Sequence, residues 1–512
     1  MAVFNTYIVG VTLGTVLPIW AVVVAIYRYY FHPLRNFPGP ITNAVSGLPT
    51  VVNLISGGQH AYIKRLHDRY GAVVRIAPNE LSFLSPGAWE DIYGFRSHDE
   101  PLEKDPIWIG ALVNDGAHPM PYAPRQDHGR LRRAFSHPFS NTSVLQQESI
   151  IQSHLRKLVW RLGELADASQ SRPINLKDWY LFVTLDVIGD LCFGAPFGCL
   201  DKGTGTEWSR SLMKAIRCAV YDQASRRIAG PGTWLQKKMA SYLIPQEYQD
   251  GKMKHFLNSR EKVEERLKYG LESEKRDFIY YVLRSNEAKK LLTPLEIIVN
   301  SSAFVAAGSD NTTTALTVIT YCVLANPEAQ AKVVAEIRGR VETADDITWA
   351  NIKDLPYLGA VISEGLRLYG PITVGLLRQV NPAGKGIVID GNYVPPGTTV
   401  SVHLWSAGHS KLNWTRPEEF LPERWLNPDQ FPHDRLQASQ PFSLGPRGCI
   451  GKNLSLIELR LALCYIFWAF DVELDRESAW KWDIAGEMKN ITTYLTIERP
   501  DLMATLRRVE RG

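Results

Sequence analysis

The most informative stretch of this 512-residue chain reads Phe442-Ser443-Leu444-Gly445-Pro446-Arg447-Gly448-Cys449-Ile450-Gly451. One cysteine stands among three glycines, and an arginine precedes it by two residues. Glycine has no Cβ, so the backbone can turn tightly around the sulfur and its N–H groups can donate to it. We therefore expect Cys449 to be a thiolate ligand of a haem iron, and Arg447 to neutralise a haem propionate. The alternative is a buried free cysteine in a glycine-rich loop.

The composition is that of an ordinary globular protein, with 45% hydrophobic and 21% charged residues. The net charge of +4 is too small to indicate a nucleic-acid partner. None of the six cysteines forms a C-x-x-C pair, which excludes the usual zinc and redox spacings. We expect a reducing compartment and buried thiols everywhere except at Cys449.

The N-terminal segment is apolar and carries no charged residue before Arg28. Residues 1–27 are long enough to cross a bilayer as one helix. Arg28 and Arg35 follow without an intervening acid, which places the rest of the chain in the cytosol by the positive-inside rule. A cleaved signal peptide is the alternative, but it would have a basic start and a shorter apolar run. We predict an anchor at 1–27, a basic and proline-rich stalk at 28–40, and a catalytic domain at 41–512.

Short strand-like runs lie early and late in the globular part, with helical patterns between them. The runs are Val73–Ile76, Glu80–Phe83, Ile387–Ile389 and Val400–Val402. No repeat and no Gly/Ser-rich linker divides this part of the chain. The sequence therefore predicts one mainly α domain with a minor β sheet.

One predicted helix is unusually long. It begins with a capping box and proline at Thr293-Pro294-Leu295-Glu296 and runs to about Ala325. Asn326-Pro327 is expected to stop it and to cap the next helix. Its centre, 308–314, is too polar for lipid, so we expect a groove for dioxygen in which Asp310 relays protons. The alternative is a helix kinked at Gly308 whose polar side chains bond to the backbone.

Two further groups of charges carry weaker signals. Glu364 and Arg367 share a helix face at i, i+3, and Arg424 could supply a second guanidinium to a buried carboxylate. An exposed ion pair is the alternative. His128 and Arg132 share a face at i, i+4 and could clamp a propionate. Arg130 and Arg133 face elsewhere on the same helix. The alternative for this basic segment is a solvated surface. Arg378 is another candidate for a propionate contact.

The order of these motifs resembles the cytochrome P-450 family over nearly the whole chain. The resemblance implies that fold, with haem b bound between the long helix and the cysteine loop. It implies Cys449 as the metal ligand, with Phe442, Gly445, Arg447 and Gly451 completing the loop. The other residues that it implies are the structural triad Glu364, Arg367 and Arg424, and the propionate contacts His128, Arg132 and Arg378.

Two positions depart from the family pattern. His128 stands where the family usually has tryptophan, and it can still donate a hydrogen bond. Asn311 follows the helix acid where threonine usually assists proton delivery, and an amide has no hydroxyl. Thr312 is adjacent but points about 100 degrees away on an ideal helix. The candidate catalytic residues are therefore Asp310, Asn311 and Thr312.

Within the family, the 186–194 segment and Ala307-Gly308-Ser309 look like those of fungal secondary-metabolism members. This likeness predicts a monooxygenase of the endoplasmic reticulum membrane that oxidises an apolar small molecule. NADPH-cytochrome P-450 reductase would supply electrons, steered by Arg130, Arg133 and Lys452. The expected pocket includes Phe304, Ala307, Ile107–Val113 and Asn490–Tyr494.

Two other functions remain open at this point. Asn311 in the threonine position would suit a haem-thiolate isomerase, dehydratase or peroxygenase that needs no reductase. A haem-binding membrane protein without catalytic activity is the third hypothesis.

Overall fold

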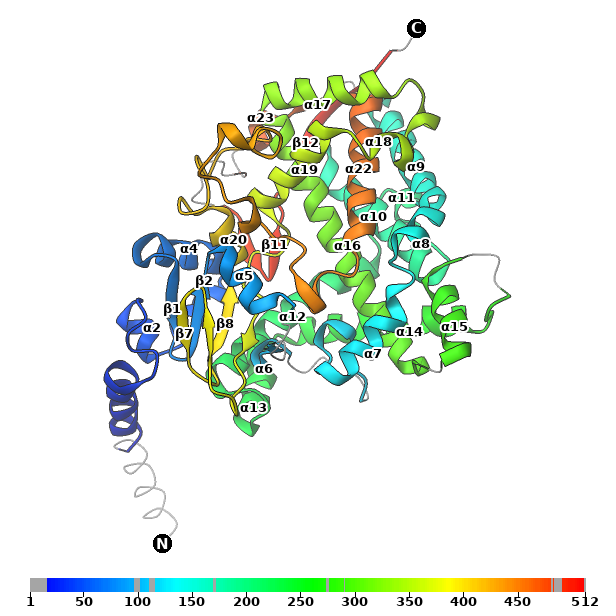
Figure 1. Ribbon diagram of the computed structural model, residues 1–512. Helices are drawn as coiled ribbons and strands as arrows, with labels where there is room; N and C mark the ends of the chain where they lie inside the picture. The colour runs from blue at the N-terminus through cyan, green and yellow to red at the C-terminus, as the bar shows by residue number, and fades with distance from the viewer. Residues whose placement is uncertain are drawn as a thin grey trace.

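The structure is a computed structural model that describes residues 16–95, 102–109, 116–168, 172–272, 276–289, 291–479, 482 and 490–510. Helices dominate it, and the largest sheet lies on one side (Figure 1), so the predicted mainly α architecture with minor β sheet is confirmed. The four predicted strand-like runs all lie in strands, and the boundaries differ by at most one residue.

The largest sheet joins strands from distant parts of the chain in the order β1-β2-β8-β5-β3. Its members are β1 (Val73–Ala77), β2 (Glu80–Phe83), β8 (Thr399–Val402), β5 (Arg378–Gln379) and β3 (Glu103–Lys104). Only β2 and β8 pair in parallel, with Glu80 opposite Thr399; the other neighbours are antiparallel. The β3–β5 pair sets Lys104 opposite Arg378, so two cations from remote segments are neighbours.

Four long helices form the central core: α9 (Glu148–Ala168), α10 (Leu176–Phe193), α16 (Pro294–Leu324) and α22 (Lys452–Ala469). α16 packs between α10 and α22, and α22 also packs against α9. α10 and α22 read as apolar nearly all round, as expected of helices that are covered on every side.

α16 is the predicted long helix, and its capping box is present: Thr293 accepts from the Glu296 backbone, and Glu296 accepts from the Thr293 backbone. Its buried hydroxyls bond back to the helix, as when Thr314 donates to the Asp310 carbonyl at 2.7 Å. The prediction for Asn326 is half wrong. Asn326 precedes α17 (Pro327–Arg340), but its side chain donates to the Cys322 carbonyl at 2.7 Å and so satisfies the end of α16 instead.

A second layer of helices packs beside this core. α12 (Glu207–Ala229) packs on α13 (Trp234–Leu243), α14 (Gln246–Leu267) and α3 (Leu48–Ile55). A hairpin of β10 (Thr492–Tyr494) and β11 (Thr496–Glu498) lies near α3 and α12.

The remaining elements connect these layers. Among them are the helices α4 (Gln59–Tyr70), α5 (Pro86–Tyr93), α6 (Pro106–Ile109), α7 (Arg125–Ser136), α8 (Asn141–Gln146), α11 (Cys199–Lys202), α15 (Phe278–Lys289) and α18–α21 (349–352, 356–369, 404–408, 423–426). Two small sheets complete the fold: β4 (Ile174–Asn175), β12 (Met503–Arg508) and β9 (Phe470–Leu474), and the pair β6 (Ile387–Ile389) and β7 (Asn392–Val394).

The described chain starts in a helix at 16–26 that continues as the π-helical turn η1 (Tyr27–Phe31). This dark blue helix projects away from the globular part (Figure 1), and its apolar side chains, Trp20 among them, are exposed. Among the described residues, no helix is both long enough and apolar enough to cross a membrane. Residues 1–15 of the expected anchor lie outside the described part.

Candidate active site

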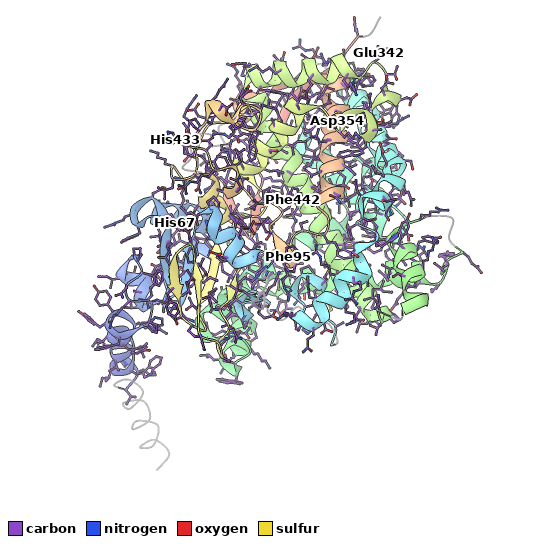
Figure 2. All side chains as sticks on the ribbon, in the orientation of Figure 1. His67, Phe95, Glu342, Asp354, His433 and Phe442 are labelled. Atoms are coloured by element: carbon purple, nitrogen blue, oxygen red, sulfur yellow. The ribbon has the colours of Figure 1, made fainter. Side chains whose placement is uncertain are left out.

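The cysteine loop closes on itself through backbone hydrogen bonds. The Cys449 N–H donates to the Phe442 carbonyl at 2.8 Å, and the Gly448 N–H donates to the Gly445 carbonyl at 3.0 Å. Phe442 lies near the middle of the molecule (Figure 2). Ser443 holds a φ of +57°, a conformation that non-glycine residues rarely adopt and that marks strained functional loops.

Gly445 is needed for a reason that the sequence did not reveal. Its φ is +65°, and a Cβ there would lie 2.0 Å from the Tyr93 carbonyl oxygen of α5. We expected the loop glycines to make room for the sulfur. At this position the glycine instead lets the loop rest on the backbone of α5.

Burial dominates the surroundings of the Cys449 thiol and raises its pKa. A hydrogen bond from the Gly451 backbone and the charges of Arg132 and Lys452 oppose this effect only in part, and they are the groups that would support a thiolate. Gly451 is the N-cap of α22, so the sulfur also lies at the positive end of an 18-residue helix. The other five cysteines are buried and free, and Cys449 alone is exposed by accessible area. A thiol that has accessible surface but is surrounded by protein on most sides faces an internal cavity and not the outer surface.

Five basic side chains gather near this loop from four separate segments. His128 of α7 feels the positive charges of Arg447, Arg132, Lys104 and Arg378, and burial with these charges lowers its pKa to about 3. Burial lowers the pKa of Arg378 to about 10, and it lowers the pKa of Lys104 well below its ordinary range. The sequence analysis expected four of these residues and missed Lys104.

This cluster is short of negative charge. Among the described residues, one carboxylate forms an ion pair with this cluster: the exposed Glu103, which lies 3.4 Å from Arg447. Arg132 donates to the Gly448 carbonyl at 2.7 Å, and Arg447 donates to the Ala123 carbonyl at 3.1 Å. Buried cations gathered without matching anions are costly. Two carboxylates such as haem propionates would supply the missing charge, so the residues present fit a haem whose iron meets Cys449.

Asp310 on α16 is held by a residue that the sequence analysis did not single out. Arg499 donates to the Asp310 carboxylate at 2.6 Å and to its carbonyl at 3.1 Å. Both side chains are almost fully buried, at 3% and 6% exposure. Nothing in the local sequence around Arg499, which follows β11, indicates this long-range contact.

Asn311 and Thr312 point in different directions, as expected from the helix period. Asn311 lines a cavity, whereas Thr312 is hydrogen-bonded to the buried Glu458 of α22. Burial raises the pKa of Glu458 to about 8, and the bond from Thr312 partly offsets that effect. Glu458 is the third site residue, after Lys104 and Arg499, that the sequence did not indicate, because a lone acid within a helix is usually exposed.

The cavity has a volume of about 1100 Å³ and lies between α16 and the covering helices α12, α13 and α14. Its α16 wall is made of small residues at 303, 306 and 307, followed by Asp310 and Asn311. Ala307 is therefore in the wall, as expected. Phe304 is not where we expected it: it packs against Phe135 and Phe139 with ring centroids 5.0 and 5.1 Å away.

The predicted loops contribute only in part. Trp108 lines the cavity from 107–113, but residues 110–113 lie outside the described residues. From the C-terminal hairpin the lining residues are Leu495 and Thr496, just beyond the expected 490–494.

The structure brings Glu364, Arg367 and Arg424 together in the core. The Glu364 carboxylate accepts from Arg367 at 2.8 Å and from Arg424 at 3.0 Å, and all three side chains have 0% exposure. The Trp425 indole and the Leu421 backbone donate the remaining bonds to Glu364. A buried carboxylate with this many donors stays ionised, and the pKa of Glu364 is lowered despite its burial.

Arg130 corrects a second expectation. It donates to Glu296 at 2.5 Å and to the Leu291 carbonyl at 2.6 Å, so it ties α7 to the capping box of α16. It is therefore not a free charge for steering a partner. Arg133 and Lys452 are exposed.

Comparisons with known proteins agree with this site. A family model described as Cytochrome P450 matches residues 39–492. The cytochrome P450 monooxygenase aba2 of Botryotinia fuckeliana is 46% identical over 506 residues, covering 98% of this chain and 95% of that protein. The monooxygenase ABA2 of Pyricularia oryzae is 41% identical over 492 residues, covering 94% and 93%. The averantin hydroxylase of Dothistroma septosporum is 38% identical over 473 residues, covering 92% and 86%.

The matched family and the haem-thiolate site inferred from the residues point to the same protein class. The resemblance drawn from the sequence motifs is thereby confirmed, and the chain belongs to the cytochrome P450 family.

Proposed function

We propose that this cytochrome P450 is a membrane-attached monooxygenase that inserts one oxygen atom from dioxygen into an apolar small molecule in the biosynthesis of a secondary metabolite. The observation that carries the proposal is the position of Cys449 in the loop just before α22, a helix that packs against the cavity-lining helix α16. As in its family, the cofactor is haem b, and NAD(P)H supplies electrons through a reductase.

Cys449 would be the iron ligand, and the thiolate-bound haem supplies dioxygen activation when it is present. Phe442, Gly445, Arg447 and Gly451 would form its loop, in which the Gly451 N–H donates to the sulfur. His128, Arg132, Arg378 and Arg447 would hold the propionates, and the position of Lys104 adds it to this set. Glu364, Arg367 and Arg424 would keep the fold rigid behind the site.

Asp310 and Asn311 would move protons at the cavity wall. Both line the cavity, and both have one side-chain oxygen that lacks a hydrogen-bond partner among the described residues. Those oxygens can accept from water that carries a proton. The role that we predicted for Thr312 is indirect, because its hydroxyl is hydrogen-bonded to Glu458.

The cavity supports an apolar substrate. Alanines at 303, 306 and 307 leave room against α16, and Leu495 and Ile372 add apolar surface. Because the walls come from separated elements, they indicate the substrate's class and not its structure.

The N-terminal segment would attach the protein to the endoplasmic reticulum membrane as a single span at 1–27, with the catalytic domain in the cytosol. Exposed apolar side chains along 16–26 support this. NADPH-cytochrome P450 reductase would donate electrons, and the exposed Arg133 and Lys452 remain candidates for steering it.

Turnover with a labelled oxidant tests the proposal. The metabolite that accumulates when the gene is disrupted is incubated with the purified full-length protein, reductase, NADPH and isotopically heavy dioxygen. We expect the wild type to form a product that carries one heavy oxygen atom. We expect Cys449→Ser to form no product. Turnover that persists without NADPH and reductase would support an isomerase, dehydratase or peroxygenase, which Asn311 favours. Absence of any oxygen or NADPH consumption would contradict the proposed function.

A further inference from the structure

The hairpin of β10 and β11 touches two parts of the site at once. At its tip, Leu495 and Thr496 line the cavity, and Leu495 holds a φ of +73°. Such a conformation costs a branched-chain residue energy and persists only where the surroundings impose it. At its end, Arg499 reaches the acid of α16. A single short segment therefore connects the substrate space with Asp310.

Arg499 fixes the orientation of Asp310 through several bonds. It donates to Asp310 Oδ1 at 2.6 Å, to the Asp310 carbonyl at 3.1 Å, and to Thr314 Oγ1. The Thr314 hydroxyl in turn donates to the same carbonyl at 2.7 Å. A guanidinium that grips side chain and backbone together leaves the carboxylate little freedom to rotate.

The same bonds determine which atoms stay available. Within the described part of the chain, Asp310 Oδ2, Asn311 Oδ1 and Arg499 Nε are buried atoms without a hydrogen-bond partner. Asp310 and Asn311 both line the cavity. Buried polar atoms without partners are costly unless water or a reacting group meets them. Oδ1 is committed to the guanidinium, so Oδ2 is the oxygen left for the cavity.

We propose that Arg499 is a positioning residue for proton delivery: it holds the Asp310 carboxylate by Oδ1 and leaves Oδ2, at the cavity wall, without a protein partner so that it can take up and pass on protons. The inference rests on the proposed monooxygenase function. There, one dioxygen, two electrons from NADPH and two protons give one oxidised substrate and one water. If protons are delivered incorrectly, the two-electron-reduced oxygen leaves as hydrogen peroxide and the substrate is not oxidised. The amount of peroxide formed per NADPH therefore reports on proton delivery by Asp310.

The test compares Arg499→Gln and Arg499→Lys with a matched control on the same hairpin. Glu498→Gln removes the negative charge from the hairpin's ion pair with Arg217 at 2.8 Å and leaves the contacts of Asp310 intact. Each full-length protein is reconstituted with reductase in phosphatidylcholine vesicles without added substrate. The peroxide released per NADPH is measured in light and heavy water. We expect Arg499→Gln to raise the peroxide released per NADPH several-fold and to change its isotope dependence. Arg499→Lys should give a smaller increase in this ratio, and Glu498→Gln should match the wild type.

A second readout does not depend on turnover. The infrared stretch of carbon monoxide bound to the reduced protein senses the charges that face it, so it should shift in Arg499→Gln and stay in place in Glu498→Gln. If Arg499→Gln does not fold, Arg499→Lys and Thr314→Val carry the same comparison. An unchanged band and peroxide ratio in haem-loaded Arg499 variants would overturn the inference. A wild type that consumes no NADPH when the metabolite that accumulates on gene disruption is added would instead contradict the proposed function, and the infrared band would still decide the role of Arg499.

Discussion

At the residue scale, buried charges decide which substitutions the protein tolerates. The motif spacing predicted Glu364, Arg367 and Arg424 as partners because two of them share a helix face. It could not predict that Trp425 and the Leu421 backbone complete the carboxylate's bonds. Arg499 was missed because Asp310 is 189 residues away in the chain. Lys104 was missed because a remote strand, β5, places Arg378 opposite it, and no local pattern indicates that pairing.

Glu364→Ala should destabilise the protein strongly. It leaves the fully buried Arg367 without a carboxylate partner and Arg424 with Asp434 alone, a loss of about 3–5 kcal/mol in the free energy of unfolding. Urea unfolding of the haem-loaded protein measures it. Glu164→Ala, which removes an exposed pair with Arg161, should cost under about 1 kcal/mol. Equal losses in the two variants would mean that the buried network has no special role.

Glu458→Gln should change how stability depends on pH. The folded state keeps this carboxyl protonated up to its pKa of about 8, whereas the unfolded chain releases the proton near 4.5. Between these values the folded state binds more protons, so the wild type loses stability as pH rises. The free energy of unfolding of Glu458→Gln relative to wild type should therefore grow by on the order of 1 kcal/mol per pH unit. Urea unfolding across this window that shows a constant difference would refute it.

At the element scale, local signals were reliable and long-range ones were not. The capping box of α16 was predictable because Thr293 and Glu296 are three residues apart. The parallel pairing of β2 with β8 was not, since its partners are separated by more than three hundred residues. Asn326 shows that a residue type suited to a cap can serve the preceding helix instead.

Substituting Arg130 and Arg133 should distinguish a residue that stabilises the fold from one that binds the reductase. Arg130→Gln removes the link between α7 and the start of α16, so we expect a lower thermal midpoint and an unchanged KM for reductase. Arg133 is exposed, so Arg133→Gln should raise the KM for reductase, less so at high salt, with the thermal midpoint unchanged. Scanning calorimetry and NADPH oxidation against reductase concentration give both values. The reverse pattern would contradict the assignment.

At the scale of the whole molecule, the mainly α class could be predicted from helical patterning. The cavity could not, because α12, α14, α16 and a C-terminal hairpin enclose it together. The N-terminal region joins the globule in a specific way. Arg75 donates to the Arg28 carbonyl at 3.1 Å, and Leu34 is fully buried. The stalk is thus partly built into the domain that follows it.

Two truncations should distinguish anchor from domain. Removing residues 1–27 keeps Arg28 and Leu34 in place, so this protein should bind haem normally and leave the membrane fraction. Removing residues 1–40 takes away the Arg28 carbonyl that binds Arg75 and uncovers the core cluster around Leu34, so haem content should fall. Fractionation and haem absorbance measure both. Equal haem content in the two would contradict the structural role of the stalk, and a 28–512 protein still on membranes would contradict the anchor.

The identity of the iron ligand can be tested by the absorption of the reduced protein under carbon monoxide. We predict the far-shifted Soret band of a thiolate complex in the wild type and in Cys464→Ser, whose cysteine is buried and free. We predict its loss in Cys449→Ser. A haem-loaded wild type without that band, or a Cys449→Ser variant that keeps it, would contradict the central claim that Cys449 holds the iron.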